Sequence, residues 1–393
     1  MADSRIRVLF VIPNLQQGGA ERQILQLMRR LPPRFESALC LFEDVCHYRE
    51  LLPDGEPRHV LGVTKMDGVG LDRLVKVLGQ ARPHIVHSFR DLANHWLCRA
   101  VSRAPVPVVL THVRNRRLAP LNLATDWYLS RRCDRVLINS EGIRGELVHL
   151  ARVDPKRIRV IPNVVDVDAF HPPNRPEREA ARERWGLGAD HIALLLPGRL
   201  SLQKHQLGLV RAIAKLASRG QLPSSVRVLL AGRAHSPVYT RLVSWLVAHY
   251  GLQNTIRQLG SVPAADMPAL YHASDALVMP SLWEGLPNGV LEAHLSGLPA
   301  VVSHAANVDQ LVLDGHSGFE VATLRGPALA AAIHRMIELG PDGRCDMGAR
   351  GRAHIVERFA PERVVGELVA LYESLLREKG VPEAGTARAE PPR

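Results

Sequence analysis

The sequence predicts an α/β protein built from two similar halves. Short apolar runs typical of buried strands alternate with segments of helical periodicity along the chain. A polar, proline-rich stretch from Phe170 to Arg178 interrupts this alternation, which then starts again. With 393 residues, the chain is also too long for one ordinary core. We therefore expect two Rossmann-like domains, residues 1–172 and 173–360, that face each other across a cleft.

In the first half, strands are expected at residues 6–12, 37–42, 58–61, 84–88, 106–111, 135–139 and 158–161. Helices are expected at 20–31, 71–80, 92–103 and 141–150, with another long helix between the strands at 106–111 and 135–139. Helical connections imply a parallel sheet, whose ligands bind at the carboxyl ends of the strands. Gly18, Gly19, His87 and His112 lie at such ends.

In the second half, strands are expected at residues 191–196, 226–231, 256–259, 276–279, 299–303 and 318–321. Helices are expected from Lys204 to about 217, at 237–250 and at 267–273. Arg199, Lys204 and Arg233 follow strands, and cations that converge there would neutralise a diphosphate. Taken singly, each of them has the simpler interpretation of a solvated surface cation.

The most informative stretch is Pro280 to Ala293, which follows the strand at 276–279 and runs into a helix. We expect Glu284 in the loop and Glu292 inside the helix. The loop would present backbone N–H groups of Asn288, Gly289 and Val290 at the positive helix end. These groups suit an anionic or hydroxyl-rich ligand, and a carboxylate can accept hydrogen bonds from the vicinal hydroxyls of a sugar or ribose. The alternative is an exposed loop acid and a solvated helical one, but the nearby cations favour a nucleotide-sugar site.

Composition excludes several classes of protein. The 46% apolar content is globular, and no run reaches the roughly 18 apolar residues of a membrane-spanning helix. The five cysteines are scattered and form no C-x-x-C pair, which argues against a zinc site or disulfide framework and for a reducing, cytoplasmic compartment. Residues 1–7 lead into a strand without the apolar core of a signal peptide.

The net charge of +11 has two interpretations. Only six of the 50 basic residues are lysine, which is typical of a codon bias toward arginine. The functional interpretation is an anionic partner, such as a nucleotide diphosphate, an acidic lipid surface or nucleic acid. With 5% aromatic residues and no recognisable nucleic-acid motif, nucleic acid is the least favoured partner.

The segment 114–135 is basic and apolar together. Arginines flank Leu121, Trp127 and Tyr128. This pattern fits a helix lying on an anionic membrane surface, and equally an amphipathic helix packed on the sheet.

Several fragments resemble the GT-B glycosyltransferases, specifically the retaining glycosyltransferase family 4, also called group 1. The resemblance covers about residues 5–378. The matching fragments are Gly18-Gly19-Ala20-Glu21-Arg22, Asn163-Val164-Val165-Asp166 with Phe170-His171-Pro172, Gly198-Arg199-Leu200 with Lys204, Glu284 with Glu292, and Gly315-His316-Ser317-Gly318-Phe319. Their order and spacing identify the chain more strongly than any one of them.

The resemblance implies a role for each matching residue. Arg199 and Lys204 would bind the donor diphosphate, Glu292 the ribose and Glu284 the donor sugar. Gly19 would admit the diphosphate to the first helix. One of His87, His112 or Arg114 would contact the sugar or the acceptor, although Phe89 and the Arg114-Asn115 pair depart from the commoner pattern.

The resemblance also implies a helix at 361–379 that returns to the first domain; after it, residues 380–393 have the composition of a disordered tail. Asp166-Val167-Asp168 imitates a metal-binding motif, but its place after the interdomain signature favours a structural role, and we expect no metal and no cofactor.

The function expected is a retaining sugar transfer from a nucleotide-sugar to a lipid-linked or polysaccharide acceptor, at the inner face of the cell membrane. The resemblance implies a UDP-sugar as the donor, because this is the commonest donor in the family. The alternatives are a glycogen-type or disaccharide-phosphate synthase, a nucleotide-sugar epimerase, or a non-catalytic nucleotide-binding protein. The presence of Arg199, Lys204, Glu284 and Glu292 argues against the last of these.

Overall fold

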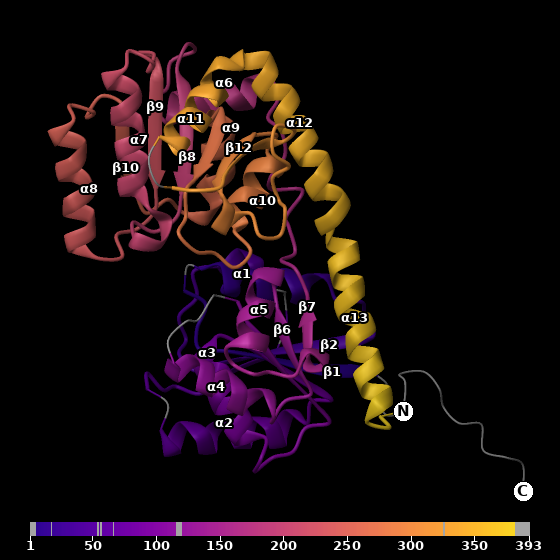
Figure 1. Ribbon diagram of the computed structural model, residues 1–393. Helices are drawn as coiled ribbons and strands as arrows, with labels where there is room; N and C mark the ends of the chain where they lie inside the picture. Colours follow the sequence, from indigo (N-terminus) through magenta and orange to yellow (C-terminus); the bar gives the residue numbers. More distant parts are fainter. Residues whose placement is uncertain are drawn as a thin grey trace, which may run out of the picture. The chain divides into compact units, whose positions relative to one another are not determined.

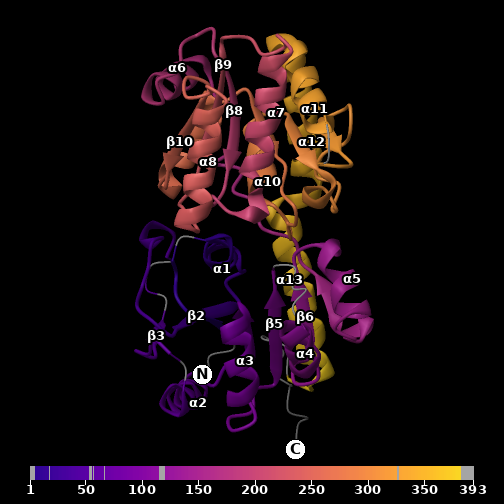
Figure 2. The same cartoon turned by 60° about the vertical axis from the view of Figure 1, so that its left-hand side comes forward.

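The computed structural model of the chain describes residues 5–16, 18–52, 55, 57–65, 67–114, 120–324 and 327–381 (Figures 1 and 2). It forms two compact units, Met1–Val164 with Pro361–Arg393, and Val165–Ala360. The change of unit after Val164 comes earlier in the chain than the junction at residue 172 that the sequence suggested. The expected disordered tail at 380–393 lies outside the described residues except for Gly380 and Val381.

The first unit is built on a seven-stranded parallel sheet with the order β3-β2-β1-β4-β5-β6-β7. The strands are β1 (Ile6–Ile12), β2 (Phe35–Leu41), β3 (Arg58–Val60), β4 (Ile85–Phe89), β5 (Val108–Val113), β6 (Arg135–Ile138) and β7 (Ile158–Val160). Every residue of β4 and β5 is buried, as expected for central strands covered on both faces.

The helices of the first unit are α1 (Gly19–Arg30), α2 (Gly68–Ala81), α3 (Asp91–Ala100), α4 (Pro120–Ser130), α5 (Glu141–His149) and α13 (Pro361–Glu378), with 3-10 turns at Arg49–Leu51 and Pro155–Arg157. Two of them, α2 and α5, begin at a side-chain cap. The Asp67 carboxylate accepts from the N–H of Gly70 at 2.9 Å and so caps α2. The Ser140 hydroxyl caps α5 in the same way, through the N–H of Gly142 at 3.1 Å.

The last helix, α13, belongs to the first unit. Its apolar face, with Val364, Leu368 and Tyr372, is buried. Ion pairs hold its outer side: Arg34 with Glu373 at 2.8 Å and Lys379 with Asp134 at 2.6 Å. Because its apolar face is buried and its ion pairs reach Arg34 and Asp134, α13 is an integral part of the first unit.

The second unit repeats the design with a six-stranded parallel sheet of order β10-β9-β8-β11-β12-β13. Its strands are β8 (Ile192–Pro197), β9 (Val226–Ala231), β10 (Ile256–Gly260), β11 (Ala276–Met279), β12 (Ala300–Ser303) and β13 (Gly318–Val321). Its helices are α6 (Arg175–Arg184), α7 (Gln206–Ser218), α8 (Pro237–His249), α9 (Met267–Ala273), α10 (Asn288–Leu295), α11 (Ala328–Glu338) and α12 (Gly340–Phe359). Turns of 3-10 helix occur at Leu202–Lys204, Ala264–Asp266 and His304–Ala306.

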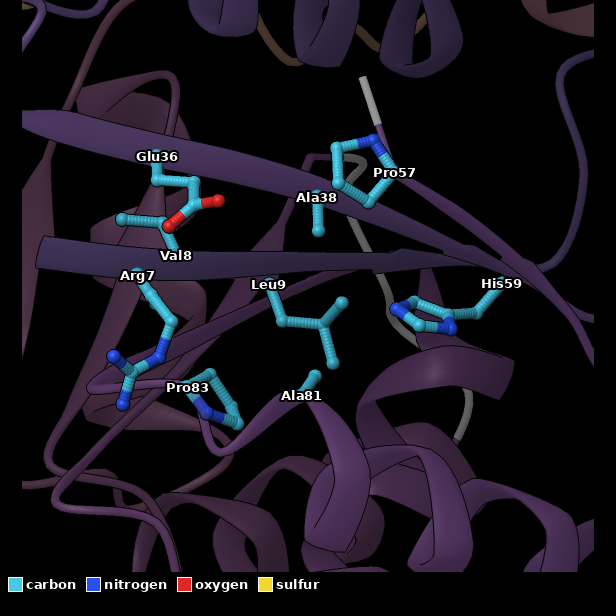
Figure 3. A pocket seen from close by; sticks show the side chains of 9 residues that line it. All are labelled: Arg7, Val8, Leu9, Glu36, Ala38, Pro57, His59, Ala81 and Pro83. Atoms are coloured by element: carbon cyan, nitrogen blue, oxygen red, sulfur yellow. The ribbon is translucent and has the colours of Figure 1, made fainter. Parts of the chain in front are cut away.

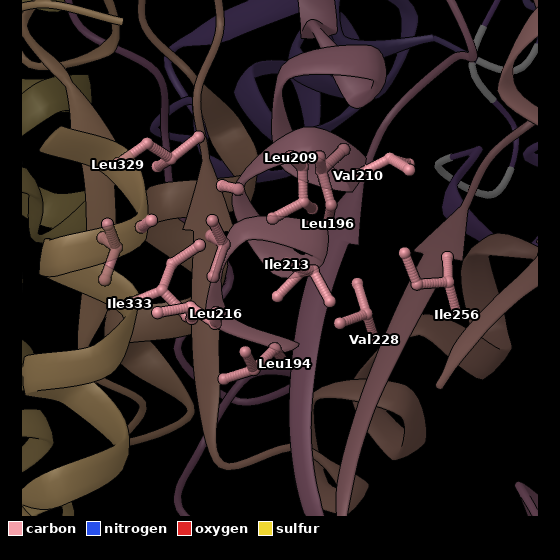
Figure 4. Packing of buried hydrophobic residues seen from close by; sticks show 14 of the residues in the cluster. Leu194, Leu196, Leu209, Val210, Ile213, Leu216, Val228, Ile256, Leu329 and Ile333 are labelled. Carbon is pink, nitrogen blue, oxygen red and sulfur yellow. The ribbon is translucent and has the colours of Figure 1, made fainter. Parts of the chain in front are cut away.

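One face of this sheet packs against α7 and α11 (Figure 4). Leu194 and Leu196 of β8 meet Ile213 of α7, and all three side chains are fully buried. Alternate residues of β8 therefore enter this cluster, while Ala193 and Leu195 enter the cluster on the other face. The expected α/β class, with helices on both faces of a parallel sheet, is confirmed in each unit.

The expected linker at 170–178 is partly wrong, because α6 begins at Arg175. The Asn174 side chain accepts from the N–H of Glu177 at 2.9 Å, and the Glu177 carboxylate accepts from the N–H of Asn174 at 2.8 Å. This reciprocal pair is a capping box, and Pro176 lies in the first turn, where proline is tolerated. The prolines mark a helix start rather than a continuous loop.

Candidate functional site

Three loops of the second unit carry the expected charged residues to one edge of the sheet. Arg199 follows β8, Arg233 follows β9 and Glu284 follows β11, and these three strands are neighbours. Because the sheet is parallel, all three residues lie at its carboxyl edge. The N–H of Leu200 donates to the carbonyl of Arg233 at 3.0 Å, which joins the first two loops. Both arginine side chains are exposed and available to a ligand.

The centre of this edge is an ion pair. The Lys204 ammonium lies 2.6 Å from Glu284 Oε1, and the two side chains are only 16% and 8% exposed. Gln203 joins the same loops, since its carbonyl accepts from the N–H of Leu282 at 2.8 Å and its side chain donates to the carbonyl of Trp283 at 3.0 Å. A phosphate bound by Lys204 would share the ammonium with Glu284.

The expectation that Lys204 opens a helix is wrong. Lys204 ends a 3-10 turn, and α7 begins only at Gln206, after His205 in the left-handed region at φ 53°. The buried Gln206 side chain donates to the carbonyl of Arg199 at 2.9 Å and accepts from the N–H of Ser201 at 3.3 Å. Gly198 has φ 135°, and a Cβ there would lie 2.8 Å from Lys204 Cε. The loop is therefore shaped to let the lysine fold back over it.

Glu292 lies on α10 with its side chain largely buried. Its Oε2 accepts from the hydroxyl of Tyr271, on α9, at 2.8 Å. The Tyr271 ring is fully buried and packs edge-on to Phe170, with ring centres 5.6 Å apart. Tyr271 was missed from the sequence, because nothing in its local pattern connects it to a carboxylate 21 residues later. It fixes the orientation of Glu292.

The helix start at Asn288, Gly289 and Val290 differs from the expectation in one respect. The N–H of Val290 donates to the carbonyl of Pro287 at 3.1 Å, so it is not available to a ligand. Gly289 has a packing role, since a Cβ there would lie 2.7 Å from Met279 Cε and 3.0 Å from Pro197 Cγ. This close approach brings the first turn of α10 down onto the ends of β8 and β11.

In the first unit, the glycine loop lies at the start of α1, which begins at Gly19 with Gly18 extended before it. The Glu21 carboxylate packs directly against Gly18 and is nearly inaccessible. Arg90, after β4, pairs with Glu21 at 2.6 Å. The positive end of α1 therefore already faces a carboxylate of its own chain, a contact that sequence reasoning missed.

His87 and His112 are both in the core of the first unit. Their rings are stacked with centres 5.5 Å apart, and each is at most 1% exposed. His87 Nδ1 lies 2.7 Å from the Tyr372 hydroxyl of α13. Burial, and secondarily the charge of Arg114, lowers the pKa of His87 to about 3. Burial, Arg114 and the neighbouring His87 lower the pKa of His112. Both are neutral at physiological pH.

Arg114, at the end of β5, is only partly buried. Its guanidinium donates to the Asn163 side-chain oxygen and lies 6.0 Å from the centre of the Phe89 ring. Burial lowers the pKa of Arg114 to about 10, while Glu21 acts in the opposite direction. The Asn139 amide also donates to the Asn163 oxygen, at 3.3 Å. Of the three candidates for a sugar or acceptor contact, Arg114 has the most accessible side chain.

Two other features are the Asp166 motif and a cavity of the first unit. The Asp166 carboxylate accepts from the N–H of Ala169 at 3.2 Å, which is a local turn contact. A cavity of about 150 Å³ lies over the first halves of β1 and β2 and the start of β3, and its lining is mainly apolar (Figure 3). Its residues are Arg7, Val8, Leu9, Glu36, Ala38, Pro57, His59, Ala81 and Pro83. The cavity therefore lies toward the amino ends of these strands, away from the carboxyl edge of the sheet.

Among the described residues, no three His, Cys, Asp or Glu side chains gather as metal ligands. In the same part of the chain, no helix combines the length and apolar character needed to cross a membrane.

Relatives and solved structures resemble this chain over most of its length. The D-inositol 3-phosphate glycosyltransferase of Geodermatophilus obscurus is 29% identical over 412 aligned positions, which cover 95% of this chain and 88% of that protein. The structure of HepE from Anabaena, in complex with UDP and glucose, matches with a TM-score of 0.83 at 22% identity and covers 94% of this chain and all of that one. A glycosyltransferase structure from Rickettsia africae matches with a TM-score of 0.81 at 19% identity, covering 95% of this chain and 99% of that one.

Two family profiles match the two halves in turn. The profile for Glycosyltransferase Family 4 matches residues 17–169. The profile for Glycosyl transferases group 1 matches residues 191–339 and so contains the Lys204–Glu284 pair and Glu292. Both the fold and the family expected from the sequence fragments are confirmed. The chain therefore belongs to the group 1, family 4 glycosyltransferases.

Proposed function

We propose that this glycosyltransferase moves a sugar from a nucleotide-sugar to a lipid-linked or polysaccharide acceptor of the cell envelope, with retention at the anomeric carbon. The observation that carries the proposal is the carboxyl edge of the second sheet. There the Lys204–Glu284 pair shares the edge with two exposed arginines, and Tyr271 fixes Glu292 on the adjacent helix. A nucleotide-sugar needs cations for its diphosphate and carboxylates for its hydroxyls, and this edge supplies both.

In the proposed reaction, the bond from the anomeric carbon to the diphosphate breaks, and a bond to the acceptor oxygen forms on the same face. The acceptor proton leaves on the released diphosphate. Arg199 and Lys204 stabilise the negative charge that builds on the departing group, an effect that is strong in a partly buried site. Glu292 binds the ribose hydroxyls and Glu284 the donor sugar, and neither a metal nor a cofactor takes part.

UDP-sugar is the first donor to test, because UDP and glucose are the molecules bound in the HepE structure. We place the reaction in the cytoplasm, at the inner face of the membrane. On α4, Leu121 is 78% exposed and Trp127 40% exposed, and the Arg131 guanidinium lies 4.3 Å from the Trp127 ring centre. These residues belong to the segment 114–135, of which the structure describes residues 114 and 120–135. They support a membrane-facing role for α4.

A second candidate is a small phosphorylated acceptor, the class named for the Geodermatophilus relative. The supporting observation is the polar cluster of the first unit, where Arg90 and Arg114 lie at the ends of β4 and β5, which are neighbours. Two arginines at one sheet edge are suited to a phosphate. Such an acceptor would compete there with Glu21 for the Arg90 guanidinium.

The donor assignment is tested by calorimetry with UDP, ADP, GDP and UDP-glucose. We expect one nucleoside diphosphate to bind, and Arg199→Ala to weaken binding at least tenfold through loss of a charge-assisted contact. Arg219→Ala is the matched control, since Arg219 is also an exposed arginine of this unit but follows α7 rather than a site strand. Equal affinities for wild type and Arg199→Ala would contradict the site, and no binding of any of the four ligands would contradict the donor assignment.

The acceptor class is tested separately with radiolabelled donor. Transfer to an extracted lipid-linked acceptor supports the first candidate, and transfer to inositol phosphate supports the second. If the second holds, Arg114→Gln should raise the KM for the phosphorylated acceptor while leaving the affinity for the nucleotide unchanged.

A further inference from the structure

The outer face of α8 is apolar and exposed. Val238, Leu242 and Trp245 are 73%, 43% and 58% exposed, and their spacing of four and three residues aligns them on one side of the helix. The opposite side, with Val243 and Leu246, is buried in the core of the second unit. Figure 1 shows α8 at the outer edge of this unit, beside α7. An aligned, exposed stripe that includes tryptophan is unusual on a helix that has solvent as its only neighbour.

The surroundings of this stripe carry charge of one sign. From His191 to Ala265 the sequence contains nine Lys or Arg and no Asp or Glu. Arg241 lies within the stripe on α8, and Arg211 and Arg219 are exposed on and just after α7. None of these three arginines forms an ion pair with a carboxylate in the described parts of the chain. Trp245 stacks on His249 with ring centres 5.0 Å apart, so the stripe continues one turn further along α8.

The apolar stripe and the positive charge around it together indicate which kind of surface covers α8. A second copy of this chain, packed face to face, would bring Arg241 against its own counterpart and is disfavoured by repulsion. An anionic bilayer suits both properties, because tryptophan and aliphatic side chains enter the headgroup region while arginines contact lipid phosphates. We propose that the outer face of α8 docks on an anionic lipid surface, with Trp245, Leu242 and Val238 inserted and Arg241 on the headgroups.

The position of α8 gives this docking a consequence. The helix begins at Pro237, four residues after Arg233, so its first turn lies beside the carboxyl edge of the sheet. Docking would hold that edge close to the lipid headgroups. The proposal extends the suggestion for α4 to the other unit, and it does not require that the protein transfer sugar.

The test is flotation of the full chain, without donor or acceptor, with vesicles of phosphatidylglycerol and phosphatidylcholine, and with vesicles of phosphatidylcholine alone. Wild type should bind the anionic vesicles and not the neutral ones, and high salt should weaken binding. Trp245→Gln should lower the partition coefficient about tenfold through loss of its inserted ring. Arg241→Glu should lower it about 25-fold, since each unit of charge contributes about fivefold.

Two further variants make the result specific. Val69→Gln on α2 is the matched control, because Val69 is an exposed aliphatic residue, 55% accessible, on a helix of the other unit, and its variant should bind as wild type does. Trp127→Gln reports the contribution of α4. All four substituted side chains are exposed, and unchanged thermal midpoints would establish that the variants are folded.

The proposal is overturned if wild type does not float with anionic vesicles, or if Trp245→Gln and Arg241→Glu bind as tightly as wild type. It is also overturned if sedimentation velocity shows a dimer that Trp245→Gln dissociates while vesicle binding is unchanged, because the face would then join two copies. Loss of binding in Trp127→Gln alone would assign the membrane contact to α4 instead.

Discussion

The Lys204–Glu284 ion pair allows the stability of the second unit to be separated from its activity. Lys204→Met leaves a carboxylate that is 8% exposed without its cation. Removing one partner of a buried pair costs about 3–5 kcal/mol. We expect the lower limit, about 3 kcal/mol, because the Lys204 side chain is 16% exposed and Gln203 Nε2 still lies 3.4 Å from the other carboxylate oxygen.

Adding Glu284→Gln to Lys204→Met should restore stability. The glutamine keeps the size of the side chain and removes the unpaired charge, so the double variant should regain about 1–3 kcal/mol relative to Lys204→Met. Activity should not return, because the proposed contact with the leaving diphosphate requires the ammonium of Lys204. In the double variant, stability therefore recovers while activity remains lost.

Thermal unfolding followed by circular dichroism measures the first readout. For a unit of this size, a loss of 3 kcal/mol lowers the midpoint by about 6–12 °C. If the two units give separate unfolding transitions, only the transition of the second unit should shift. Arg175→Met, which breaks an exposed pair with Glu179 in the same unit, is the control and should not shift the midpoint measurably.

Three outcomes would refute this reasoning. A Lys204→Met variant as stable as wild type would mean that the ion pair is not buried in solution. A double variant as unstable as Lys204→Met would mean that an unpaired charge is not the cause of the loss. Sugar transfer by the double variant would remove Lys204 from the proposed mechanism.

Three further predictions concern the supporting residues. Tyr271→Phe removes the hydroxyl that holds Glu292, and it should lower the free energy of unfolding by about 1–3 kcal/mol and weaken nucleotide binding. Urea titration measures the first effect and calorimetry the second. Unchanged binding would exclude Tyr271 as a positioning residue. Gly289→Ala places a methyl group 2.7 Å from Met279 Cε and should cost about 1–3 kcal/mol in urea unfolding, of which the added change Met279→Ala should recover a part if the clash is the cause. Burial lowers the pKa of His87 from 6.5 to about 3, so between these values the unfolded chain binds a proton that the folded chain does not. The free energy of unfolding should therefore fall with decreasing pH, by up to about 1.4 kcal/mol per unit for this residue, and His87→Gln should reduce the slope measured between pH 7 and pH 5.

The elements that sequence periodicity predicts best are the buried strands. The bounds of β1, β9, β11 and β13 agree with the predicted ranges at both ends, since short, mostly apolar runs stand out from the polar loops that flank them. Helix starts were predicted less well, as α6 and α7 show. Their positions depend on caps and turns in which a proline or a left-handed residue can either begin or end a helix.

The sequence by itself also determined that Arg199, Arg233 and Glu284 come after strands and that Glu292 lies inside a helix, since that is a matter of local order along the chain. Only the tertiary structure decided which of them meet. Lys204 pairs with a glutamate 80 residues away, and Glu292 with a tyrosine 21 residues before it, because the sheet order places β8 beside β11 and packs α9 near α10. The same holds for His87, which was a candidate ligand contact because it lies near the end of a strand. Its ring is covered by Tyr372 of α13, from the other end of the chain. Periodicity reports the environment of one residue, whereas a site is a set of distances between residues that only the packed sheet fixes.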